Sequence, residues 1–295
     1  MYDRYFCYYV SMIKLIASDC DGTLLNDKSV LDEETIKAIR RFQETGGIFM
    51  LATGRNRWDA AYVTDRVDNC VLNCDSGAAL FDYDGKQLLI HEIGKEKIRS
   101  LSNLSMHYDF PVMYHGTQGT YITCDYDKFK ERAVEQIRNT YTPMMAEDIF
   151  DWIFNNKHYK YGADISEVLN EGIIRMEPVF ISDEEYELIC DECKKIFRDM
   201  NIYTGSFLNN IEINSRESDK GRAILEYCRL KGIKDDEVIV IGDSVNDVSM
   251  FRLFENSYCV KSGQADAKKA AKHIIGSNDE LGVAELINKI CDENV

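Results

Sequence analysis

The sequence predicts an α/β protein in which a doubly wound parallel sheet is interrupted by a second, α+β domain. Two observations support this fold class. Short apolar runs alternate with amphipathic segments over residues 12–74, and the alternation returns after Lys220. Between about 78 and 213 the pattern is irregular, with short strand-like runs among amphipathic helices. Regular alternation of strands and helices is typical of a parallel sheet with right-handed crossovers, so the irregular stretch indicates an insertion.

The N-terminal elements follow from periodicity and end signals. An apolar run over 12–17, broken only by Lys14, is typical of a buried parallel strand. The next segment has Asp32 at the N-cap position and two glycines at its end, which predicts a helix over 32–45. The same criteria predict a strand at 48–52, a helix from about Trp58 and a strand at 71–72.

The later elements are predicted in the same way. In the irregular stretch we expect strands at 79–81, 88–90, 121–123 and 173–181, and helices at 131–140 and 183–200. After Lys220 we expect helices at 221–231, 248–254, 265–271 and 281–290, and strands at 238–241 and 257–260. The expected domains are 12–82 with 210–295 for the parallel sheet and 83–209 for the insertion, preceded by a tyrosine-rich extension over 1–11.

The composition narrows the functional classes. With 295 residues and 45% hydrophobic content, the chain can fill a sizeable core. No apolar run approaches the roughly 18 residues of a membrane-spanning helix. A net charge of −16 argues against a nucleic acid as partner. Ten cysteines, without a recognisable secretory signal or zinc-type pairing, favour a reducing cytoplasm.

Two carboxylates point to the chemistry. Asp19 and Asp21 lie two residues apart at the carboxyl end of the first expected strand. Ligands bind at this edge of open α/β sheets. A carboxylate placed there can act as a nucleophile and form an aspartyl-phosphate intermediate. The alternative is a solvated acidic turn, since Asp-Gly is common in turns. We favour the catalytic interpretation.

Four segments resemble the motifs of the haloacid dehalogenase-like (HAD) phosphohydrolases, in the order that this family requires. They are Asp19–Leu25 for motif one, Leu51–Arg55 for motif two, Ser218–Gly221 for motif three and Val238–Asp247 for motif four. The resemblance spans the chain from Met12 onward and implies a Rossmann-like HAD core. The insertion between motifs two and three resembles the α/β cap of the Cof-type branch.

The resemblance implies a role for each motif. Asp19 would attack phosphorus in line and become phosphorylated, while Asp21 would act first as the acid and then as the base. The phosphoryl group would be bound by Thr53, Gly54 and Lys220. Mg²⁺ would be held by Asp19, the main-chain carbonyl of Asp21 and Asp243. Supporting positions would be Gly22, Ser244, Asn246 and Asp247.

Several further residues concern substrate specificity, or have a role that the sequence leaves undecided. Arg55 either pairs with an acid or contacts the substrate. Ser76 and Gln264 stand where Cof-type proteins commonly have asparagine, and both bear on what the site accepts beyond the phosphate. The histidines of the insertion lack metal-ligand spacing and are interpreted as packing or surface residues: His107, His115 and His158.

The sequence therefore predicts a cytoplasmic, Mg²⁺-dependent phosphoric monoester hydrolase for small phosphate monoesters, with sugar phosphates as the expected class. One alternative is a phosphosugar mutase, which would yield an isomeric phosphate in place of free phosphate. Another is a catalytically silent ligand-binding or regulatory module, against which the intact Asp19, Asp21, Lys220 and Asp243 argue. The expected partner is a small-molecule phosphate ester, with neither nucleic acid nor membrane. The oligomeric state does not follow from the sequence.

Overall fold

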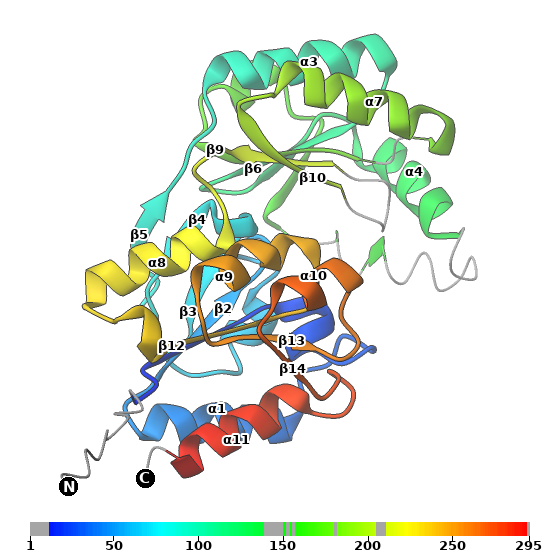
Figure 1. Cartoon of the computed structure of the whole chain (residues 1–295). Coiled ribbons are helices and arrows are strands. Elements are labelled where there is room, and N and C mark those ends of the chain that lie inside the picture. The colour runs from blue at the N-terminus through cyan, green and yellow to red at the C-terminus, as the bar shows by residue number, and fades with distance from the viewer. Residues whose placement is uncertain are drawn as a thin grey trace, which may run out of the picture.

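The structure is a computed structural model and describes residues 12–138, 150–151, 154, 157–179, 182–204 and 211–293. The expected extension at 1–11 and the last two residues of the helix expected at 131–140 lie outside the described residues. Figure 1 shows two parts, each built around one sheet. Within the described ranges, none of the helices has the length and apolarity needed to span a bilayer.

The larger sheet forms the lower part in Figure 1 and, over the described residues, has eight strands in the order β14-β13-β12-β1-β2-β3-β4-β5. The parallel strands are β1 Leu15–Ser18, β2 Ile48–Ala52, β3 Val71–Cys74, β12 Val238–Gly242, β13 Ser257–Val260 and β14 His273–Ile275. A hairpin of β4 Ala79–Phe81 and β5 Gln87–Ile90 adds antiparallel to β3. Because β1 lies between β2 and β12, the strand order reverses there, and the predicted doubly wound core is confirmed.

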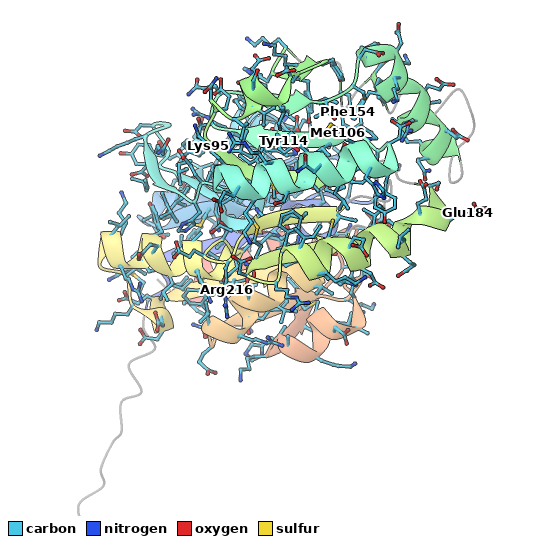
Figure 2. The ribbon with its side chains drawn as sticks, turned by 90° about the horizontal axis from the view of Figure 1, so that it is seen from above. Lys95, Met106, Tyr114, Phe154, Glu184 and Arg216 are labelled. Atoms are coloured by element: carbon cyan, nitrogen blue, oxygen red, sulfur yellow. The ribbon has the colours of Figure 1, made fainter. Side chains whose placement is uncertain are left out.

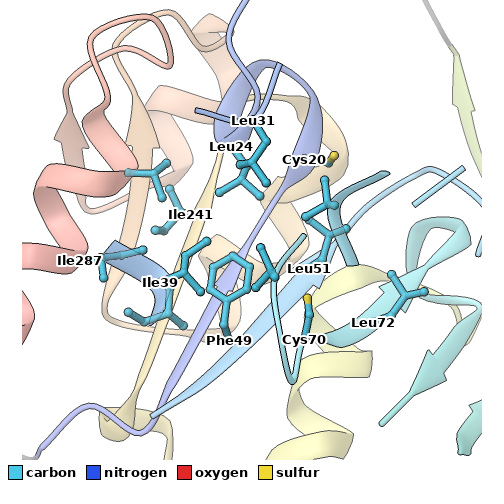
Figure 3. Packing of buried hydrophobic residues seen from close by; sticks show 14 of the residues in the cluster. Cys20, Leu24, Leu31, Ile39, Phe49, Leu51, Cys70, Leu72, Ile241 and Ile287 are labelled. Carbon is cyan, nitrogen blue, oxygen red and sulfur yellow. The ribbon is translucent and has the colours of Figure 1, made fainter. Parts of the chain in front are cut away.

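Helices cover both faces of this sheet. They are α1 Glu33–Glu44, α2 Ala61–Thr64, α8 Lys220–Lys231, α9 Val248–Leu253, α10 Ala265–Ala270 and α11 Gly282–Glu293. Figure 3 shows Ile39 of α1 and Ile287 of α11 near Phe49 of β2, in one buried cluster. The next residue, Met50, belongs to the cluster that α8 and α9 cover on the other face. This division follows from the strand, whose successive side chains point to opposite sides.

The smaller sheet forms the upper part and, in the part of the chain that the structure describes, has six strands in the order β10-β11-β9-β6-β7-β8. Its strands are β6 Val112–Gly116, β7 Thr120–Ile122, β8 Tyr159–Tyr161, β9 Ile173–Pro178, β10 Met200–Thr204 and β11 Ile211–Ser215. The helices of this part are α3 Lys95–Tyr108, α4 Tyr126–Arg138, α6 Ile165–Val168 and α7 Asp183–Ile196. Figure 2 shows α3 and α7 side by side over the sheet, with Tyr114 of β6 beneath them.

Most expected elements are present, and the differences have local causes. The helix expected at 183–200 ends at Ile196, because Phe197 leaves the helical region and Met200 begins β10. β10 pairs with β11 along its whole length, so tertiary pairing overrides the local helical pattern. The strand expected at 173–181 ends at Pro178, and α2 has only four residues. The sequence did not predict α3 and β6.

Sheet pairing also bears on the expected domain ranges. β5 belongs to the larger sheet although its residues were assigned to the insertion, because it completes a hairpin with β4. β11 belongs to the smaller sheet although its residues were assigned to the parallel core, because it pairs with β9 and β10. Each boundary is therefore displaced by one strand from the expected ranges at 82 and 209, and the division into domains stays a prediction.

Candidate active site

The carboxyl ends of β1, β2 and β12 meet at one edge of the larger sheet and bring the predicted polar residues together. Asp19 follows β1, Thr53 follows β2, and Asp243 follows β12. The main-chain N–H of Asp19 donates to the carbonyl of Ile241 at 2.8 Å, which continues the pairing of β1 with β12 into the site. The fourth contributor is Lys220, the first residue of α8.

Lys220 is the cation at the centre of this group. Its Nζ donates to Asp19 Oδ1 at 2.6 Å, to Asp247 Oδ1 at 2.7 Å and to Asn246 Oδ1 at 3.3 Å. The side chain of Lys220 is completely buried. Burial lowers the pKa of an ammonium, but the charges of Asp19 and Asp247 outweigh it and raise the pKa of Lys220 above its ordinary value. Lys220 is therefore held charged against Asp19.

Asp247 fixes the loop that follows β12. Its Oδ2 accepts hydrogen bonds from the main-chain N–H groups of Asp243 and Ser244, both at 2.9 Å. The Ser244 hydroxyl in turn donates to Asn246 Oδ1 at 2.7 Å. Because its other oxygen accepts from Lys220, Asp247 joins this loop to the start of α8. The supporting positions expected here thus lie within one hydrogen-bonded group.

Asp243 lies against the turn that follows β1. Thr23 Oγ1 donates to Asp243 Oδ1 at 3.1 Å. Gly22 has a φ of +77°, and a β-carbon there would lie 2.9 Å from Asp243 Oδ2, so both the backbone and the space require glycine. Burial, and then the charge of Asp247, raise the pKa of Asp243 to about 6. The main-chain N–H of Gln264 donates to the carbonyl of Asp243 at 2.7 Å.

Three carboxylates of this group suit a divalent cation. Asp19, Asp243 and Asp247 each offer an oxygen, and these oxygens lie within 4.8 Å of one another. Burial raises the pKa of Asp19 well above its usual range, against the opposing charge of Lys220. Three carboxylates and one ammonium leave two negative charges uncompensated, and hard oxygen donors are the ligands that Mg²⁺ prefers. The donor set therefore fits the expected ion.

Asp21 points to a different partner. Its two carboxylate oxygens accept from Arg55 Nε at 2.8 Å and from Arg55 Nη2 at 2.6 Å. The side chain of Asp21 is 54% exposed and that of Arg55 is 17% exposed. Asp21 is therefore accessible to solvent, unlike the buried Asp19. Of the two roles left open for Arg55, the structure therefore favours pairing with the acid. The carboxylate of Asp21 is not among the clustered metal-ligand atoms.

The remaining predicted positions also lie at this edge. Thr53 is buried, and its Oγ1 accepts from the main-chain N–H of Arg55 at 3.0 Å, which shapes the loop around Gly54. Ser76 follows β3 in a left-handed conformation, with a φ of +56°. Asn73 of β3 donates to the carbonyl of Lys220 at 3.0 Å, so the start of α8 is fixed against this strand.

A buried charged cluster from the smaller sheet was not predicted. Arg175 of β9 donates to the carbonyl of Gly54 and lies 3.6 Å from Asp75 Oδ1 and 3.3 Å from Glu177 Oε2. His115 of β6 contacts Glu177 Oε2 at 3.1 Å. His115, which was expected to be a packing or surface residue, is buried, and the groups that it packs against are charged and polar. The available signal was a pair of charged residues, Arg175 and Glu177, at alternate positions of a strand whose other residues are apolar.

The other two histidines of the insertion lie elsewhere. His107 meets the Tyr108 ring edge-on at 4.5 Å on α3. His158 stacks on the Trp58 ring at 4.7 Å, next to the smaller sheet. Neither belongs to the group of carboxylates at the sheet edge, so the sequence-based interpretation as packing or surface residues suits both.

Comparison with known proteins connects this site to a family. A model of the family described as haloacid dehalogenase-like hydrolases matches residues 16–287. The 5-amino-6-(5-phospho-D-ribitylamino)uracil phosphatase YwtE of Bacillus subtilis (strain 168) is 26% identical over 293 residues, with 94% of this chain and 98% of that protein covered. The phosphatase YbjI of Escherichia coli (strain K12), named for the same substrate, is 25% identical over 280 residues, with 94% and 96% covered.

Solved structures support the fold. A haloacid dehalogenase-like hydrolase from B. subtilis superposes with a TM-score of 0.81 at 21% identity, covering 94% of this chain and 99% of that one. A haloacid dehalogenase-like hydrolase from Bacteroides thetaiotaomicron gives 0.77 at 20% identity, with 94% and 99% covered. The predicted α/β architecture with an inserted α+β part is therefore shared with solved proteins over nearly the whole chain.

Proposed function

Because the chain belongs to the haloacid dehalogenase-like hydrolases, we propose that it is a Mg²⁺-dependent phosphatase that hydrolyses small phosphate monoesters through a phosphoaspartate at Asp19. It is an enzyme of the phosphoric monoester hydrolase class, as its curated relatives are by name. The observation that carries the proposal is the contact of Lys220 Nζ with Asp19 Oδ1 at 2.6 Å, buried at the carboxyl edge of the larger sheet.

Asp19 is proposed as the nucleophile. One of its oxygens forms the new bond to phosphorus as the bond from phosphorus to the ester oxygen breaks. Lys220 keeps positive charge beside the reacting oxygens, and Thr53 adds a hydroxyl from the neighbouring loop. Such fixed charges and donors stabilise the charge that develops on the transferring group without reorganising at the moment of reaction.

Asp21 is proposed as the acid and base. Protonated Asp21 gives its proton to the departing alcohol oxygen, and the resulting carboxylate then takes a proton from the water that hydrolyses the phosphoaspartate. The bidentate contact with Arg55 holds this carboxylate in one orientation. Arg55 therefore acts as the positioning residue of Asp21.

Mg²⁺ would be held by Asp19, Asp243 and the main-chain carbonyl of Asp21, and it would neutralise phosphate charge while orienting the ester. Asp247 lies in the same carboxylate group, but both of its oxygens already accept hydrogen bonds from the protein. We therefore assign Asp247 to positioning Lys220 and the loop after β12.

The proposed substrate is the phosphate ester of a sugar or another polyhydroxylated small molecule. Relatives that align over nearly their full length are named for a ribitylamino compound, whose phosphate lies on a polyol chain. We place the protein in the cytoplasm on the strength of its cysteine content; the nine cysteines among the described residues are free thiols.

A phosphate-release assay over sugar phosphates, nucleotides and flavin phosphates tests the proposal, with and without Mg²⁺. We expect free phosphate from at least one sugar or polyol phosphate, loss of activity in a chelator, and loss of activity in Asp19→Asn. An isomeric phosphate as the product would favour the mutase. An inert protein that binds a ligand tightly would favour the silent module.

A further inference from the structure

Glu212 of β11 reaches from the smaller sheet to the phosphate-binding loops of the larger one. Ser76, in the turn after β3, donates a hydrogen bond to Glu212 Oε2 at 3.2 Å. A β-carbon added at Gly54 would lie 4.0 Å from Glu212 Oε1 and 3.9 Å from Asn246 Nδ2. Glu212 and Asn246, which also contacts Lys220, therefore both lie near Gly54, one of the residues proposed to bind the phosphoryl group.

Glu212 is the most exposed carboxylate of the buried charged cluster around Arg175. Its side chain is 20% exposed, whereas those of Arg175, Glu177 and Asp75 are 6%, 8% and 3% exposed. Ser76 engages Oε2, and Oε1 accepts no hydrogen bond from any residue within the described ranges. Glu212 can therefore present one acceptor oxygen to a molecule bound beside the loops.

The guanidinium of Arg175, the cation of the cluster, already pairs with groups of the protein. Arg175 donates to the carbonyl of Gly54 and lies within 3.8 Å of carboxylate oxygens of Asp75, Glu177 and Glu212. It cannot turn to a second anion without leaving buried carboxylates unpaired, which is costly. Three carboxylates around one guanidinium leave an excess of negative charge, and Glu212 is the most exposed of the three. That excess repels an anionic group on a ligand and suits a neutral hydrogen-bond donor.

We propose that Glu212, oriented by Ser76 and Arg175, accepts hydrogen bonds from hydroxyl groups of the leaving group and disfavours leaving groups that carry an acid. The inference rests on the proposed phosphatase function and adds the residue that selects the substrate. It also gives a role to Ser76, whose identity was expected from the sequence to affect what the site accepts beyond the phosphate. A serine hydroxyl there donates to Glu212 while the backbone keeps its left-handed turn.

The test measures binding in an Asp19→Asn background, so that it does not depend on turnover. Calorimetric titration with ribitol 5-phosphate and with n-pentyl phosphate compares two esters of equal carbon number, with and without hydroxyl groups. Glycerol 3-phosphate and 3-phosphoglycerate compare a hydroxymethyl group with a carboxylate. The variants are Glu212→Ala and Glu212→Gln. Glu217→Gln, at an exposed carboxylate (77% accessible) between β11 and α8, is the matched control.

We expect Glu212→Ala to raise the dissociation constant of ribitol 5-phosphate by about tenfold or more, the usual effect of losing a hydrogen bond to a charged group. The dissociation constant of n-pentyl phosphate should stay within about twofold, because no hydroxyl group is involved. Glu212→Gln should narrow the preference for glycerol 3-phosphate over 3-phosphoglycerate by about tenfold, since the repelling charge is gone. Glu217→Gln should leave all four values unchanged.

Equal weakening of ribitol 5-phosphate and n-pentyl phosphate in Glu212→Ala would overturn the proposal, because it would mean that the residue supports only the phosphate site. Tighter binding of phosphoethanolamine than of ribitol 5-phosphate would also overturn it, since Glu212 would then select a cation. Circular dichroism and the thermal midpoint of the near-isosteric Glu212→Gln variant confirm that the site is folded. If the wild type releases no phosphate but the binding differences hold, the proposed function fails, and Glu212 is still shown to select hydroxylated phosphate esters as ligands.

Discussion

Lys220 ties the proposed nucleophile to the fold. Its buried ammonium pairs with Asp19 and with Asp247, which in turn fixes the loop after β12. A buried charge that loses its partner costs about 3–5 kcal/mol, and replacing Lys220 alone would leave both Asp19 and Asp247 without their cation. The same contacts that hold the site together therefore keep one oxygen of Asp19 aligned with a positive charge.

The roles of Asp19 and Asp21 can be separated by the leaving group. In Asp21→Asn the attack of Asp19 on p-nitrophenyl phosphate should proceed, because nitrophenolate leaves without being protonated. The hydrolysis of the phosphoaspartate should stall, because no base takes the proton from water. We expect a rapid burst of one equivalent of nitrophenol per chain, followed by turnover slower than wild type by about 10²–10⁴-fold. Stopped-flow absorbance measures both phases, and a full-rate steady state without a burst would argue against this role of Asp21.

Most residues of the site could be predicted from the sequence because they follow strands. Asp19, Thr53 and Asp243 come directly after apolar runs, and the ends of parallel strands must meet at one edge. The partner of Arg55 could not be predicted, since nothing local distinguishes an acid from a substrate as its target. The link from Glu212 to Ser76 joins two sheets across 136 positions, and no sequence period reports such a contact.

At the scale of elements, the turn after β1 and the loop after β12 pack against each other. Gly22 lies so close to Asp243 that a methyl group there would collide with the carboxylate. Thr23 donates to the same carboxylate. The position of Asp243 therefore depends on Gly22 of motif one, although Gly22 has no side chain. Any larger residue at position 22 would displace the Asp243 carboxylate.

Two glycines with similar backbone angles allow this contact to be tested. Gly22 has a φ of +77° and Gly46 a φ of +88°, but a β-carbon at Gly46 would meet nothing within 4 Å. Both Gly→Ala variants should lose about 1 kcal/mol of stability through the left-handed backbone. Only Gly22→Ala should displace Asp243, lower kcat and raise the Mg²⁺ concentration needed for half-maximal activity. Thermal melts and Mg²⁺ titrations check this, and equal activities of the two variants would contradict it.

The elements of the parallel core could be predicted better than those of the inserted sheet. Buried parallel strands such as β2 and β12 are continuous apolar runs, which stand out in the sequence. In the smaller sheet, β10 is partly exposed and follows an amphipathic helix without a break in pattern. Its pairing with β11 decides its conformation, and pairing partners are not encoded locally.

At the scale of the whole molecule, the two sheets are joined through buried polar groups. Arg175 donates to the loop after β2, and Asn214 of β11 donates to the carbonyl of Asp75 at 2.8 Å. Tyr159 of β8 donates to Asp59 Oδ2 at 2.7 Å. Each contact comes from a different strand of the smaller sheet and ends beside the predicted phosphate-binding loops. Three strands of the smaller sheet therefore contact the loops that follow strands of the larger sheet.

The stability of the metal-free protein should depend on pH through its clustered carboxylates. Burial raises the pKa of Asp243 from 3.8 to about 6, so the folded state holds this proton more tightly than the unfolded state. The stabilisation is fully present below about pH 4 and is lost as the pH rises through about 6. We expect the thermal midpoint in a chelator to fall more steeply from pH 5 to pH 7 (roughly spanning that pKa) in the wild type than in Asp243→Asn.

An exposed aspartate provides the control for this titration. Asp266 of α10 is 73% accessible, and Asp266→Asn should reproduce the wild-type slope. Addition of Mg²⁺ should raise the midpoint more at the higher pH, where the carboxylates are ionised and free to bind the cation. Parallel slopes in the wild type and in Asp243→Asn would mean that Asp243 does not titrate in this range.

The most direct measurement locates the phosphoryl group during turnover. The Asp21→Asn variant is mixed with Mg²⁺ and a substrate, quenched in acid and digested, and the peptides are analysed by mass spectrometry. We predict one phosphate per chain, labile to hydroxylamine, on the peptide that contains Asp19, and none after Asp19→Asn is added to the same variant. Phosphate on another residue, or product formed with no labelled protein at any quench time, would contradict covalent catalysis by Asp19.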